Sequence, residues 1–261
     1  MPSLNSVVAL TRIGFASRGV MYLIIGYLAL RSGRTEDGAG ALRTLEGGSG
    51  ALLLWVMALG FFAYGVWRLS EAAFDTGGHG SDAKGKAARA GGAISGLVHF
   101  GLGILAIKLA LGSGGGGGDG ARSGAAKALE WPFGEVALFV VAAGLLLTGA
   151  FQLIKAYKGD FLRDLAPKAS RRPWVQWMGR AGYAARGVVF LVMAWFLFKA
   201  GLESDAGEAG GMGAALSAFP KTARQLVAFG LLLFGLFSLV EARFRRINDP
   251  RLIDRLKDAA A

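Results

Sequence analysis

Charged side chains inside apolar segments are the residues of this 261-residue sequence with the most capacity for chemistry. Arg18 lies within the first apolar segment and Glu71 follows the second, while Arg186 and Glu241 hold the same places in the fifth and sixth. An arginine can form an ion pair with a glutamate, or it can bind an anion such as a lipid phosphate. Both interpretations stay open, and we expect Arg18 to pair with Glu71 and Arg186 with Glu241.

The middle of the sequence supplies the reason for this pairing. At the corresponding positions, Ser95 replaces the arginine and Lys155 replaces the glutamate. Because both members change together, each arginine is predicted to contact the glutamate of its own unit. An unpaired arginine at the centre of a membrane helix costs roughly 3 kcal/mol or more, so a partner is expected.

Other chemical patterns are weak. Gly80, Gly85 and Lys86 have the G-x-x-x-x-G-K spacing of a phosphate-binding loop, but Ala87 stands where a Ser or Thr must bind magnesium. A lone histidine on an apolar segment, as His99 is, is more typical of a buried structural residue than of a ligand. The sequence has no cysteine, no H-E-x-x-H and no G-x-S-x-G. We therefore expect no catalytic site, no metal and no cofactor, and the protein is not expected to be an enzyme.

Six apolar segments must position these residues. The sequence is 53% hydrophobic and only 18% charged, with a mean hydropathy of +0.45. A bilayer requires about 20 mostly apolar residues per helix. The predicted fold is therefore all-α and integral to a membrane, since few soluble helices are apolar on every face. The six predicted transmembrane helices cover residues 13–30, 51–69, 93–111, 133–154, 183–198 and 226–240.

Pairs of these segments form a unit that occurs three times. The first segment of each unit opens on a shared pattern: RIGFASRGVMYLIIG, RAGGAISGLVHFGLG and RAGYAARGVVFLVMA. Because each unit crosses the membrane twice, all three copies enter it in the same orientation, which predicts a pseudo-threefold axis along the membrane normal. We predict one membrane domain, 1–261, with repeat units 11–75, 88–160 and 179–248 and a short tail, 249–261.

Glycines recur five residues apart in every predicted helix. Small residues let helix backbones approach closely in lipid. At about 100° per residue, glycines five apart lie on different faces, so each helix is predicted to pack against two neighbours. The predicted packing positions are Gly14, Gly19, Gly60, Gly65, Gly91, Gly96, Gly144, Gly149, Gly182, Gly187, Gly230 and Gly235.

The formal net charge of +11 indicates orientation in the membrane. The N-terminus, the second and fourth loops and the tail carry eighteen Lys and Arg against nine Asp and Glu, whereas the other loops carry nine against nine. Since loops rich in Lys and Arg stay on the cytoplasmic side of the membrane, both termini are predicted to be cytoplasmic. The basic residues lie in short connectors and not in an exposed basic domain, so no nucleic-acid partner is expected.

The fourth loop and the tail have the composition of the headgroup layer. Indole rings lie half in lipid, and arginine attracts anionic phosphate, so this part of the loop is predicted to be interfacial. Topological anchoring is favoured over a specific lipid or partner site. The tail is predicted to start a surface helix at Pro250. The interfacial residues are Arg171, Arg172, Trp174 and Trp177.

Nearly the whole chain resembles a family of bacterial membrane proteins known as domain of unknown function twelve hundred and six, and the first and third units fit its pattern best. Its members open each unit with R-x-G-[FY]-A-x-R-G-V-[VM]-[YF]. The matching residues are Arg12, Gly14, Phe15, Arg18, Gly19 and Tyr22, and Arg180, Gly182, Tyr183, Arg186, Gly187 and Phe190. The middle unit departs from it with Gly92, Ser95 and His99. The resemblance implies a multi-pass protein of the inner membrane, and it implies no catalytic residue and no substrate.

Two classes of function remain open from the sequence. The first is a structural or accessory membrane protein that binds lipid or a larger membrane complex through its helix faces. The second is a small transporter or channel with a path along the pseudo-threefold axis, which would need polar residues at mid-membrane. His99, Thr148 and Gln152 are the main candidates to line such a path. The scarcity of polar residues favours the first class.

Overall fold

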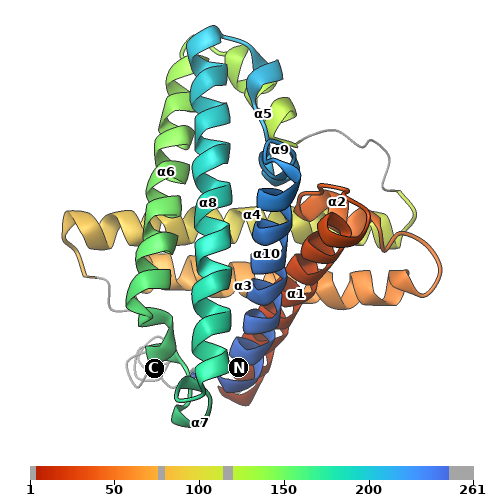
Figure 1. Cartoon of the computed structure of the whole chain (residues 1–261), viewed down its shortest axis with the longest axis vertical. Coiled ribbons are helices and arrows are strands. Elements are labelled where there is room, and N and C mark those ends of the chain that lie inside the picture. The colour runs from red at the N-terminus through yellow and green to blue at the C-terminus, as the bar shows by residue number, and fades with distance from the viewer. Residues whose placement is uncertain (1–3, 76–79, 114–119, 247–261) are drawn as a thin grey trace, which may run out of the picture.

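The computed structural model describes residues 4–75, 80–113 and 120–246, and six long helices dominate this part of the chain (Figure 1). Each contains a stretch long and apolar enough to cross a membrane, which confirms the predicted all-α membrane fold. The tail at 249–261 and the glycine run at 114–119 lie outside the described residues. The long helices are α1 (Leu4–Arg31), α3 (Gly50–Phe74), α4 (Ala83–Ala110), α6 (Gly134–Lys158), α8 (Pro173–Glu203) and α10 (Lys221–Phe244).

The helices α1, α4 and α8 begin well before the residues that hydropathy predicts. The helix α4 begins at Ala83, where the side chain of Asp82 accepts a hydrogen bond of 2.8 Å from the backbone N–H of Gly85. Similarly, α8 begins at Pro173, a residue suited to a first helical turn. The Asp82 carboxylate therefore occupies the helix N-terminus where a phosphate would bind, and the G-x-x-x-x-G-K pattern has no phosphate-loop geometry.

Short helices lie between the two long helices of each repeat. They are α2 (Gly38–Arg43), α5 (Gly120–Leu129) and α9 (Met212–Ser217). Two of these helices pack into the core, since Ala41 and Leu42 in α2 are fully buried, as are Ala215 and Leu216 in α9. In the sequence, these short helices are marked only by Ala and Leu residues that recur in the loops. The remaining short elements are η1 (Asp160–Asp164), α7 (Pro167–Ser170) and η2 (Ala206–Glu208).

The long helices pack as three antiparallel pairs, each formed by two different repeats. These pairs are α1 with α10, α3 with α4 and α6 with α8. Contacts within a repeat, α1 with α3 and α8 with α10, then join the pairs. The resulting order is α4, α3, α1, α10, α8, α6. Within the described residues, no comparable contact joins α4 to α6, so the ring of helices is open at this point.

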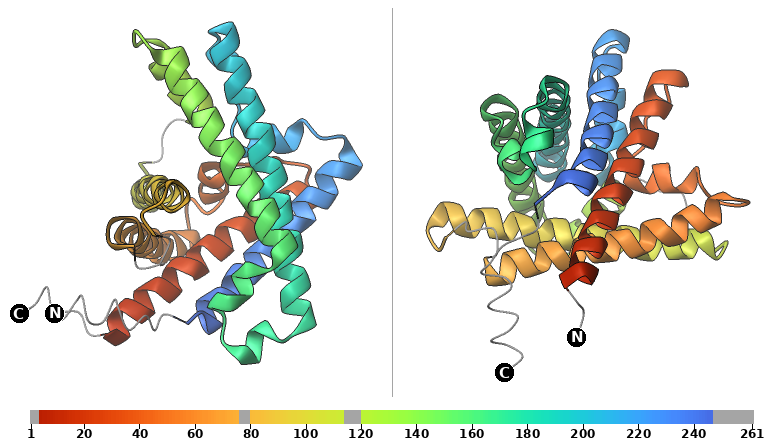
Figure 2. Two further views of the ribbon diagram at one scale, coloured as in Figure 1. Left: turned by 90° about the vertical axis from the view of Figure 1, so that its left-hand side faces the viewer. Right: turned by 90° about the horizontal axis from the view of Figure 1, so that it is seen from below.

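The three pairs point in different directions around a common core. The α3–α4 pair lies across the α6–α8 pair in Figure 1 and is seen end-on in the left view of Figure 2. The start of α1 and the end of α10 lie at the same end of the molecule. A threefold axis would tilt three equivalent pairs in this way, but the axis along the membrane normal stays a prediction.

Three glycine pairs make equivalent close crossings between repeats. A methyl group added to Gly19 would lie 2.9 Å from the carbonyl oxygen of Gly235. A methyl group added to Gly96 would lie 3.0 Å from the carbonyl oxygen of Gly65, and one added to Gly187 would lie 3.0 Å from the carbonyl oxygen of Gly149. The second glycine of each predicted pair therefore brings neighbouring repeats into backbone contact.

The first glycine of each pair lies at a close contact between the two long helices of its own repeat, and this holds only in the first and third repeats. In the first repeat, a methyl group on Gly14 would lie 3.0 Å from the Gly60 oxygen, and in the third Gly182 and Gly230 are similarly crowded. Gly91 and Gly144 of the middle repeat have no described atom of another helix within 4 Å of that position. Among the described residues, these two glycines therefore lack the helix contact that was predicted for them, because α4 and α6 make no contact comparable to those of the other helix pairs.

Candidate functional site

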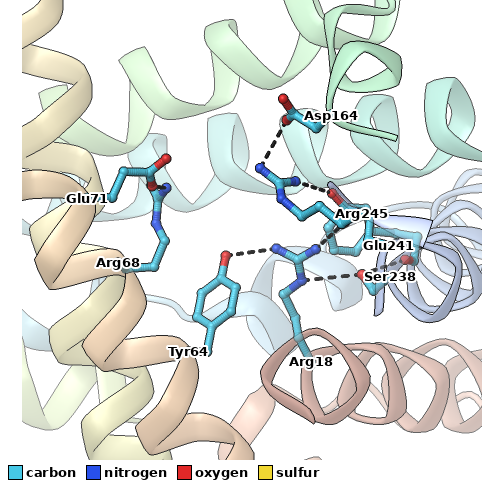
Figure 3. A network of polar contacts seen from close by, with 9 residues as sticks. Arg18, Tyr64, Arg68, Glu71, Asp164, Ser238, Glu241 and Arg245 are labelled. Carbon is cyan, nitrogen blue, oxygen red and sulfur yellow. Dashed lines mark hydrogen bonds and ion pairs between the residues drawn. The ribbon is translucent and has the colours of Figure 1, made fainter. Parts of the chain in front are cut away.

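Arg18 lies at the centre of a polar network that joins α1, α3 and α10 (Figure 3). Its Nη2 lies 2.5 Å from Oε2 of Glu241, its Nη1 donates to the Tyr64 hydroxyl at 2.9 Å, and its Nε donates to Ser238 Oγ at 3.3 Å. The guanidinium also lies over the ring of Phe15, 4.8 Å from its centroid. All three nitrogens of this buried arginine are therefore satisfied by the chain.

Glu241 connects this network to the loop between α6 and α8. It is 1% exposed and accepts a second hydrogen bond, of 2.9 Å, from Arg245 Nη1. Arg245 in turn lies 3.0 Å from the carboxylate of Asp164. Backbone bonds from Ala166 to Phe244, and from Arg246 to Asp164, hold the loop against the end of α10. Asp164 and Arg245 were not predicted from the sequence, although Glu241 and Arg245 have the i, i+4 spacing of helical ion pairs.

The predicted pairing within repeats is wrong for both pairs. Arg18 binds Glu241 of the third repeat, while Glu71 pairs with Arg68 on its own helix. The cause is the crossing of Gly19 with Gly235, which places the residue before Gly19 opposite the turns of α10 that follow Gly235. Charge partners are thus set by which repeats cross, and not by which helices are consecutive in the chain.

The second crossing, between α4 and α3, keeps an ion pair but rearranges it. Ser95 stands at the position equivalent to Arg18, and Glu71 stands at the position equivalent to Glu241. Here Arg68 supplies the positive charge from α3 itself and forms an ion pair with Glu71. Each of the first two crossings therefore contains both an arginine and a glutamate.

The third crossing, between α8 and α6, has no such balance. Arg186 is equivalent to Arg18, but Lys155 stands where Glu241 stands in the first crossing. Among the described residues, neither Arg186 nor Lys155 has an acidic group within ion-pair distance. The Nε of Arg186 is buried and has no hydrogen-bond partner in this part of the chain. Its guanidinium lies over three rings, at 4.4 Å from Phe234, 5.1 Å from Phe190 and 5.2 Å from Tyr22.

His99 is buried on α4 among aromatic rings, as expected of a structural histidine. Its ring centroid lies 4.4 Å from that of Tyr64 and 6.0 Å from that of Phe61. The Nδ1 atom lies 2.7 Å from the Ser95 carbonyl, which can only accept, so Nδ1 carries the proton. The Nε2 atom is then an acceptor, and it has no partner among the described residues.

The residues predicted to be interfacial lie at the start of α8. Trp174 and Trp177 are 56% and 73% exposed, and the side chains of Arg171 and Arg172 are exposed beside them. This exposure is compatible with a position in the headgroup layer. The contact with lipid itself stays a prediction.

Comparisons with known proteins give a family but no activity. A family model with the description "Domain of Unknown Function (DUF1206)" matches three segments, residues 13–75, 90–159 and 181–245. An "Uncharacterized protein YxxB" from Bacillus subtilis (strain 168) is 27% identical over 250 residues, which cover 91% of this chain and 90% of that protein. No solved structure matches the chain. The three matched segments agree with the three repeats.

Proposed function

Because the chain belongs to the family described as Domain of Unknown Function (DUF1206), we propose its role from the geometry: a structural or accessory protein of the bacterial inner membrane. In this role it contacts lipid or a larger membrane complex through its helix faces, and it carries out no reaction. Both termini lie on the cytoplasmic side. The proposal concerns a multi-pass membrane protein whose repeats and apolar helices are already established.

The observation that carries the proposal is the open position between α4 and α6. Only 22% of the membrane-crossing stretch of α4 and 17% of that of α6 is buried in the protein, against 56% for α1. Large apolar side chains such as Leu97, at 63%, and Val140, at 67%, remain exposed on these two helices. The outer repeats cover the equivalent glycine positions with their own helices, so the middle repeat offers the most free helix surface for an external contact.

The alternative of a transporter has less support. A transport path would need polar side chains to face a common channel near the axis. Instead, His99 packs against Phe61 and Tyr64, and the hydroxyl of Thr148 donates to the Gly144 carbonyl of its own helix at 2.7 Å. Phe61 is fully buried in the core. Aromatic packing at the centre suits a structural or accessory role better.

The test compares association with transport in one preparation. The protein should migrate in a mild-detergent extract of native membranes at a mass above that of the chain and its detergent micelle. After purification and reconstitution into liposomes, it should not raise the permeability to ions or small solutes above that of empty liposomes. A solute flux that is abolished by His99→Ala would contradict the proposal and favour the transporter.

Membrane orientation can be tested with single cysteines, since the chain has none of its own. Glu46 and Lys168 are both exposed and lie in loops predicted to be on opposite sides. A membrane-impermeant maleimide should label Glu46→Cys in intact cells, and it should label Lys168→Cys only after the membrane is opened. The reverse pattern would show that the termini are outside.

A further inference from the structure

We infer that Arg186 binds an anionic phosphate group that comes from outside the chain, either the headgroup of a phospholipid or a free phosphate. The site is the crossing of α8 with α6, where the described residues supply two cations and no acid within ion-pair distance. This inference deepens the proposed lipid contact and rests on it for the lipid source. It can fail alone, because association with a larger complex does not depend on Arg186.

Arg18, the residue equivalent to Arg186 in the first repeat, shows which partners this position requires. Arg18 is satisfied by a tyrosine hydroxyl, a serine hydroxyl and a glutamate carboxylate. The crossings of α1 with α10 and of α8 with α6 are equivalent, so the residues at the same distances in sequence from the crossing glycines correspond to the partners of Arg18. They are Phe234 in place of Tyr64, Gln152 in place of Ser238 and Lys155 in place of Glu241. Both hydroxyls are lost, Gln152 alone keeps a neutral polar group, and the carboxylate is replaced by a positive charge.

The charge balance across the three crossings points in the same direction. Arg18 and Glu241 balance the first crossing, and Arg68 and Glu71 balance the second. Glu241 and Asp164 attract Lys155 from beyond ion-pair distance, but both acids already bind Arg245, and Glu241 also binds Arg18. The third crossing therefore holds two positive charges, the half-buried Arg186 and the exposed Lys155, and no acidic group of the described residues lies within ion-pair distance of either.

Aromatic rings compensate Arg186 only in part. Contact with a ring face attracts an arginine, but the ring offers no hydrogen-bond acceptor in the plane of the guanidinium N–H groups. The buried Nε of Arg186 has no acceptor among the described residues, while the side chain as a whole is only half-buried. Arginine presents a planar fork of donors that fits phosphate oxygens in a bidentate manner. A phosphate would supply both the missing charge and the missing acceptor.

The experiment measures binding of defined probes to the purified protein in a neutral detergent. The probes are short-chain phosphatidylglycerol, short-chain phosphatidylcholine and inorganic phosphate, each followed through the thermal unfolding midpoint. We expect phosphatidylglycerol to raise the midpoint saturably, and Arg186→Gln to weaken its apparent affinity by about tenfold or more. Arg186→Lys should restore part of the affinity. Lys221→Gln removes an exposed positive charge at the start of α10, away from the crossing of α8 with α6, and it should bind like the wild type.

The outcomes separate the two sources of phosphate. A shift with phosphatidylglycerol but not with inorganic phosphate identifies a lipid headgroup, whereas a saturable shift with inorganic phosphate identifies a free anion. Equal affinity in the wild type and Arg186→Gln overturns the inference. If Arg186→Gln fails to fold, the phosphorus content of the gently purified wild type decides. About one tightly held phosphate per chain supports the site, and a wild type with no retained phosphate and no response to any probe overturns it.

Discussion

Replacing Glu241 by alanine should lower the free energy of unfolding by about 3–5 kcal/mol, because it removes the carboxylate bound to the buried Arg18 and leaves Arg245 with Asp164 alone among the described acidic residues. Glu241 is 1% exposed and binds both Arg18 and Arg245. Removing its carboxylate leaves the Arg18 guanidinium inside the helix bundle with only two hydroxyl acceptors. The measurement is thermal or denaturant unfolding of the protein in detergent.

Two double-mutant cycles identify the partner of Glu241. In the cycle with Arg18→Ala, the double variant should be more stable than the sum of the single losses predicts, since each change removes a charge that the other leaves unpaired. The matched cycle with Arg186→Ala should be additive, because Arg186 makes no ion pair with Glu241. Coupling in the second cycle and additivity in the first would restore the pairing within repeats that the sequence suggested.

Gly235→Leu should be as damaging as a core disruption, whereas Gly144→Leu should be tolerated. A methyl group on Gly235 would already lie 2.8 Å from the Gly19 carbonyl oxygen, and that atom belongs to a backbone that cannot move aside locally. Overpacking of this kind costs about 1–3 kcal/mol and occasionally more. No described atom of another helix lies within 4 Å of the position that a methyl group on Gly144 would occupy.

The two substitutions make a matched pair, since each inserts a leucine at a glycine of the second long helix of its repeat. Their measurement is the yield and the unfolding midpoint of the folded protein after purification. Equal damage from both variants would mean that α6 meets another surface at Gly144 in the membrane. That result would contradict the open position between α4 and α6.

The sequence was sufficient to predict the helices and the repeats, because both are encoded locally. Apolar length fixes a transmembrane segment, and the spacing of Gly14 and Gly19 recurs in every unit. Helix starts were predicted less well, since a polar first turn such as that after Asp82 is set by capping and not by hydropathy. The short helices in the loops were not predicted for a different reason: their burial depends on tertiary contacts, which hydropathy along the sequence does not show.

The site was predicted only in part, and the reason is the order of packing. Arg18 and Glu241 were recognised as charges inside the membrane, but their pairing depends on α1 meeting α10, which lies at the far end of the chain. Tyr64 and Ser238 carried no signal, since hydroxyl groups are common on membrane helices. Comparison of the three units did suggest that charges change in concert, but it could not show which repeats cross.

The ion pair between Arg18 and Glu241 can form only late in the synthesis of the chain. The two residues are separated by 223 positions, so Arg18 leaves the ribosome long before its acceptor exists. At about 5–20 residues per second, the interval is roughly 11–45 s. Throughout this time the first helix carries a positive charge that the finished protein neutralises, and the nascent chain must hold that charge at the headgroup layer or against the insertion machinery. The first helix to be made is therefore among the last to reach its final environment.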